Sequence, residues 1–66
     1  MFTKRDLDDT GKYAVKWSFY ASKWWAGEMV TTSTGIEYAD NVIYYDTFRE
    51  AIDDIAERIL IERRAA

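Results

Sequence analysis

Residues 46–64 read DTFREAIDDIAERILIERR, and the expected fold follows from the pattern of these residues. Its apolar residues recur at spacings of three and four, which places them on one stripe of an α-helix. The stripe consists of Phe48, Ala51, Ile52, Ile55, Ala56 and Ile59. Thr47 and Glu50 form a T-x-x-E capping box, so the pattern predicts a helix over residues 47–64. One amphipathic helix does not fold alone in water, and the rest of the chain must therefore cover its apolar stripe.

The residues before this helix have the pattern of β-strands. Residues 13–22 alternate with a period of two, which is typical of a strand with one buried face. Residues 24–32 and 36–45 read as two further strands, joined by a turn at Ser33-Thr34-Gly35. We therefore expect a small two-layer α+β fold of the order β-β-β-α. In it, a three-stranded antiparallel meander over residues 13–45 packs on one C-terminal helix.

The alternation also divides each strand into two faces. In the first strand, the face with the larger apolar side chains should meet the helix: Tyr13, Val15, Trp17, Phe19 and Ala21. In the second strand, Trp25 and Met29 form the more apolar set, but the pattern leaves open which of Trp24 and Trp25 is buried. Gly27 indicates either a bulge or a place where a neighbouring ring lies over the backbone. Residues 39–41 indicate a bulge or a short turn within the third strand.

Residues 1–12 are mostly polar, and Phe2 and Leu7 are their only large apolar side chains apart from Met1. Two interpretations stay open for this segment. It is either a partly ordered terminus pinned by those side chains, or a short edge strand over Phe2–Arg5. With 66 residues, the chain is expected to form a single domain, 1–66, with a thin core.

The composition excludes several classes of function. The chain has no cysteine and no histidine, so disulfides, thiolate chemistry and ordinary zinc sites are ruled out. It contains no glycine-rich phosphate loop and no G-x-S-x-G motif. The carboxylates of the helix lie on its water-facing side, where paired acids are usually only solvated. We therefore expect no enzyme activity, no catalytic residue, no metal and no cofactor.

Charge and hydropathy limit the partners in turn. The formal net charge is −3, which argues against a general binder of nucleic acids or acidic membranes. No apolar run approaches the ~18–20 residues that span a bilayer, and no signal peptide pattern is present. The chain is therefore expected to be cytoplasmic and to make no membrane contact.

Aromatic residues make up 17% of the chain, and one helix covers only one face of a sheet. Some rings must therefore point away from the helix: Tyr20, one of Trp24 and Trp25, and one of Tyr44 and Tyr45. Exposed Trp and Tyr are favoured at protein interfaces. An acidic helix face would steer a partner with a basic surface towards them. The predicted protein-binding residues are Tyr20, Trp24, Trp25, Tyr44, Tyr45, Glu50, Asp53, Asp54 and Glu57.

These observations favour a non-catalytic protein-binding module. Its size and composition would suit a small phage or mobile-element inhibitor or regulator of a host protein, of the anti-restriction or anti-CRISPR type. One alternative is a DNA-binding module that uses the open sheet face, with Lys12, Lys16, Tyr20 and Lys23 at the interface. The other is a homo-oligomeric structural protein, such as a homodimer whose core is the aromatic face.

Overall fold

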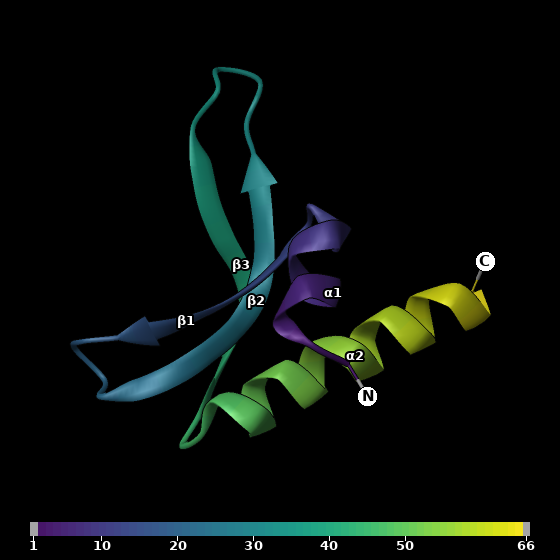
Figure 1. Ribbon diagram of the computed structural model, residues 1–66. Helices are drawn as coiled ribbons and strands as arrows, with labels where there is room; N and C mark the ends of the chain where they lie inside the picture. Colours follow the sequence, from purple (N-terminus) through teal and green to yellow (C-terminus); the bar gives the residue numbers. More distant parts are fainter. Residues whose placement is uncertain (1, 66) are drawn as a thin grey trace.

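The computed structural model describes residues 2–65, and it confirms the predicted antiparallel meander and C-terminal helix (Figure 1). The elements in order are α1 (Lys4–Thr10), β1 (Tyr13–Ser18), β2 (Lys23–Thr31), β3 (Glu37–Tyr45) and α2 (Phe48–Ala65). The strands form one sheet of order β1-β2-β3, so β1 and β3 are its two edges. No helix within residues 2–65 is long and apolar enough to cross a membrane.

Helix α1 was absent from both interpretations of the N-terminal segment, and the interpretation as an edge strand is wrong. A reciprocal capping box starts this helix: Asp6 N donates to Thr3 Oγ1 at 3.3 Å, and Thr3 N donates to Asp6 Oδ2 at 2.8 Å. Gly11 ends it in the left-handed conformation, with φ 64°. Leu7 is only 4% exposed, so the helix is held to the domain by one buried side chain.

Strand β1 ends at Ser18, four residues earlier than predicted. The chain turns over Phe19–Ser22, where Ser22 takes a positive φ of 50° and Ala21 N donates to Ser18 Oγ at 3.2 Å. Phe19 was expected to face the helix, but it lies in this turn and is 88% exposed. The prediction was wrong because period-two alternation continues through the turn without marking where the strand stops.

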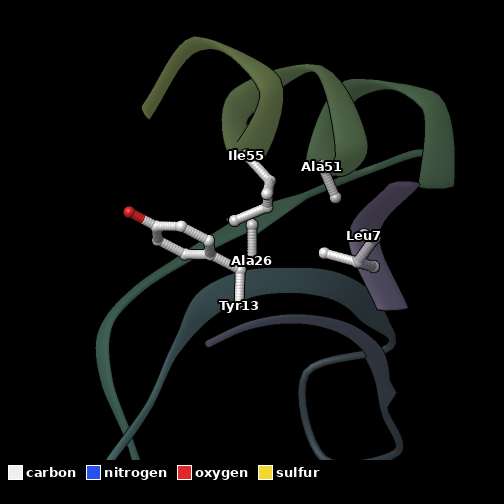
Figure 2. Packing of buried hydrophobic residues seen from close by; sticks show 5 residues of the cluster. All are labelled: Leu7, Tyr13, Ala26, Ala51 and Ile55. Carbon is white, nitrogen blue, oxygen red and sulfur yellow. The ribbon is translucent and has the colours of Figure 1, made fainter. Parts of the chain in front are cut away.

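A small core lies between the sheet and the two helices (Figure 2). Ala51 and Ile55 point from α2 towards Ala26 of β2, with Leu7 and Tyr13 on either side. Because Ala26 and Ala51 are small and fully buried, the helix can approach the sheet closely. The predicted apolar stripe of α2 is therefore confirmed as the surface that packs on the sheet.

The pairing of the strands shows which tryptophan faces α2. Trp24 pairs with Trp17 on one side and with Tyr45 on the other, so these three side chains share the face that meets α2. The Trp24 ring makes an edge contact with Phe48 of α2, with 5.1 Å between ring centroids. Trp25 therefore lies on the opposite face, which answers the question that the alternation of β2 left open.

A bulge interrupts the pairing of β2 with β3. Ala26 pairs with Ile43 and Glu28 with Asp40, so one residue of β2, Gly27, lies opposite two residues of β3. One of those two is Asn41, with a positive φ of 52°. This confirms the bulge, which was one of the two interpretations for Gly27 and one of the two for residues 39–41.

Candidate functional site

The face of the sheet that points away from α2 carries a row of three paired side chains. Lys16 of β1 pairs with Trp25 of β2, and Trp25 pairs with Tyr44 of β3. Directly paired residues of an antiparallel sheet lie on the same face. Both helices pack against the other face, so no element of residues 2–65 covers this row (Figure 1). We call this surface, formed by Lys16, Trp25 and Tyr44, the open face.

The ring of Trp25 lies close to Gly27, which has no side chain. A Cβ atom at Gly27 would lie 3.4 Å from Trp25 Cζ3 and 3.0 Å from Val42 Cγ2. The ring therefore lies over the backbone of Gly27, which confirms the second interpretation of this glycine as well. As a result Trp25 is half-buried, although no helix covers it, while Tyr44 beside it remains 51% exposed.

The turn between β1 and β2 presents two further aromatic rings. Phe19 is 88% exposed and Tyr20 is completely exposed. The hydrogen bond from Ala21 N to Ser18 Oγ holds the backbone of this turn. Tyr20 thus points away from the core, as its place in the sequence predicted, and Phe19 is an exposed ring that the sequence analysis had assigned to the core.

Two of the predicted binding residues, Trp24 and Tyr45, are not on the open face. Trp24 lies at the border of the core against Phe48. The Tyr45 hydroxyl donates a hydrogen bond to Asp54 Oδ2 on α2. This hydrogen bond, together with desolvation, raises the pKa of Tyr45 to about 12. Both residues connect the sheet to the helix.

The acidic face of α2 divides into paired and unpaired carboxylates. Asp54 was expected to be solvated, but its side chain is only 13% exposed, and it accepts from Arg58 Nε at 2.8 Å and Nη2 at 3.2 Å. Asp53 is exposed and lies 3.2 Å from Arg49 Nη2. Glu50 and Glu57 form no ion pair within residues 2–65.

These four carboxylates and Tyr45 line a shallow groove of about 330 Å³ between the end of β3 and α2. We call it the acidic groove. Two Arg side chains balance two of its carboxylates, so the groove has an excess negative charge from the other two. It is therefore suited to a basic group.

The lysines of the predicted DNA-binding surface do not come together. Lys12 Nζ lies 3.0 Å from Glu62 Oε1 of α2, and this contact raises the pKa of Lys12 and lowers that of Glu62. Lys23 forms an ion pair with Asp46, which lowers the pKa of Asp46. Only Lys16 lies in the open face without an ion pair among residues 2–65. A single unneutralised lysine provides little attraction for a phosphate backbone.

Sequence reasoning missed the exposed apolar residues of β3 and its hairpin. Ile43 is 49% exposed, Tyr38 is 47% exposed and Ile36, in the turn before β3, is 64% exposed. Their alternation was visible, but which of these side chains the helices leave uncovered was not. No protein-family model, no curated protein and no solved structure matches the chain.

Proposed function

We propose that this protein is a non-catalytic protein-binding module that contacts its partner through the open face and the adjoining β1–β2 turn. The observation that carries the proposal is the uncovered pair Trp25 and Tyr44, held in register on the face away from α2. A half-buried tryptophan beside an exposed tyrosine offers a large contact area and loses little side-chain entropy on binding. Tyr20 on the turn supplies a third ring that can enter a pocket of the partner.

The proposed biological role is that of a small phage or mobile-element inhibitor or regulator of a host protein, of the anti-restriction or anti-CRISPR type. A length of 66 residues, the absence of cysteine and an aromatic content of 17% support this role. Blocking a host protein requires a contact surface and no catalytic group, which agrees with the chemistry that the chain contains.

The test is affinity capture from a cell lysate with matched variants. Tyr20→Ala/Tyr44→Ala removes two exposed rings of the proposed surface without disturbing the core. Leu60→Ala/Ile61→Ala is the control, because it removes two exposed apolar side chains from α2. At least one protein should be captured by the wild type and the control and lost in the aromatic variant. Identical capture by all three proteins would refute the proposal.

Two measurements on the purified protein address the alternatives. Duplex DNA binding at low salt that is lost in Lys16→Glu would favour the DNA-binding module instead. A dimer in sedimentation at micromolar concentration that Tyr20→Ala/Tyr44→Ala dissociates would favour the homo-oligomeric structural protein. Under the present proposal the protein binds no duplex and sediments as a monomer.

A further inference from the structure

The outer edge of β3 is an open edge of the sheet. On its inner side β3 pairs with β2 from Trp24↔Tyr45 to Thr31↔Glu37. On its outer side no strand or loop of residues 2–65 pairs with it (Figure 1). Its outward N–H and C=O groups are therefore available to another chain.

The two edges of the sheet differ in how well they resist such pairing. Proteins commonly protect an exposed edge with lysine, proline or a bulge. Strand β1 carries Lys16 and has α1 packed beside it. Strand β3 has no lysine, arginine or proline, and its bulge at Asn41 leaves residues 42–45 as a regular stretch, Val-Ile-Tyr-Tyr. This stretch has strong β propensity and keeps Ile43 and Tyr44 about half exposed.

The surroundings of residues 42–45 differ on the two faces of the sheet. On the helix side, Tyr45 borders the acidic groove with its unpaired Glu50 and Glu57. On the other side, Tyr44 belongs to the open face beside Trp25. A strand added along this edge would point alternate side chains to the two sides. One set would meet negative charge and the other would meet aromatic rings.

We propose that residues 42–45 of β3 receive an extended segment of the partner protein as a fourth strand, with a basic side chain in the acidic groove and apolar side chains beside Tyr44. This inference rests on the proposed protein-binding function and names the part of the partner that is bound. Backbone hydrogen bonds provide affinity in such strand addition, and the alternating side chains provide specificity.

A second copy of the chain is a poorer occupant of this edge. Strand β3 contributes Glu37 and Asp40 and no basic residue, so two copies would bring like charges together. Each copy also carries the excess negative charge of its own acidic groove. Charge complementarity therefore selects a basic segment from a different protein.

The experiment titrates the ¹⁵N-labelled 66-residue protein with a blocked hexapeptide of alternating lysine and valine. Amide shifts should concentrate in residues 42–45 and at the acidic groove, and spare the β1 edge. A hexapeptide of alternating glutamate and valine should bind at least about fivefold more weakly, and added salt should weaken binding of the lysine peptide.

The decisive variant is Glu50→Gln/Glu57→Gln, which neutralises the unpaired carboxylates and keeps the capping pattern of α2. Asp8→Asn/Asp9→Asn is the control, because it changes the net charge equally on the exposed surface of α1. The first variant should bind the lysine peptide about fivefold more weakly than the wild type, and the control should bind it within about twofold.

Four outcomes would overturn the inference: equal weakening in both variants, shifts confined to β1, no shifts at millimolar peptide, or a peptide-free dimer paired through β3. None of the first three bears on capture through Tyr20 and Tyr44, so strand addition can fail while the proposed function stands. The opposite result can also be distinguished. If the peptide binds at β3 but the wild type and Tyr20→Ala/Tyr44→Ala capture the same proteins from the lysate, strand addition stands and the proposed contact through the aromatic rings fails.

Discussion

Replacing Asp54 with alanine should remove a large part of the folding stability. The side chains of Asp54 and Arg58 are 13% and 17% exposed, so the pair lies mostly out of water between β3 and α2. The same carboxylate accepts the hydrogen bond of the Tyr45 hydroxyl. In Asp54→Ala, a largely buried guanidinium loses its counter-ion and a tyrosine loses its acceptor.

The size of the loss follows from this burial. Removing one partner of a fully buried pair costs about 3–5 kcal/mol, and the residual exposure of both groups places this pair at about 3 kcal/mol. At about 0.05–0.15 kcal/mol per residue, a domain of this length has a total stability of about 3–10 kcal/mol. The variant should therefore lose a third or more of its free energy of unfolding.

Urea unfolding followed by tryptophan fluorescence measures this loss. A small domain unfolds in one step with a slope of about 1 kcal/mol per molar urea, so the midpoint should fall by about 3 M. Asp53→Ala is the matched control, because Asp53 occupies the preceding position of the helix. Its ion pair with Arg49 is exposed, and its free energy of unfolding should change by at most about 0.5 kcal/mol.

Equal midpoints for Asp54→Ala and Asp53→Ala would refute the reasoning, because burial would then make no difference to the pair. The double variant Asp54→Leu/Arg58→Met gives a further check. It removes both charges together, and apolar replacements of a buried pair are often close to neutral. Its midpoint should lie well above that of Asp54→Ala.

Two further predictions concern the faces of the sheet and the response to acid. Trp24→Ala should lower the free energy of unfolding by about 3 kcal/mol, because Trp24 packs against α2, and Trp25→Ala should lower it by only about 1 kcal/mol. Thermal unfolding measures both losses, and the reverse order would contradict the assignment of faces. Hydrogen bonds from Lys12 and Tyr13 lower the pKa of Glu62 from its ordinary 4.5, so the unfolded chain binds its proton more readily than the folded one. This contribution is present above about pH 4.5 and is lost as the pH falls through the lowered value. Glu62→Gln should therefore lose less stability between pH 7 and pH 3 than the wild type, as measured by urea midpoints, and an equal loss would contradict this linkage.

Much of the fold could be predicted because its signals are local. Helix α2 was expected over 47–64 and runs over Phe48–Ala65, since a stripe of period 3.6 leaves few alternatives. Gly27 was informative because a glycine inside a strand needs a local reason, and here both the bulge and the Trp25 ring supply one. The stripe of α2 depends on neighbours within a few residues of the chain, whereas the bulge at Gly27 is formed against β3.

Helix α1 could not be predicted with the same methods. It has seven residues, which are too few for a stable helix in isolation, even with the capping box of Thr3 and Asp6. The helix forms because Leu7 reaches a core that is built from residues 13–55. Its stability is therefore a property of long-range packing.

The candidate site likewise combines features that local sequence patterns predict with features that depend on long-range packing. The alternation and the single long helix predict a sheet with two faces, of which the helix covers one, so that some aromatic rings must remain uncovered. The face on which each ring lies is a property of the fold: Trp24 and Tyr45 lie on the face that meets α2, and Trp25 and Tyr44 lie on the opposite face. The physical reason is that alternation in a strand is symmetric between its two faces. The strand register and the packing of α2 against the small side chain of Ala26 together determine which face of the sheet is covered.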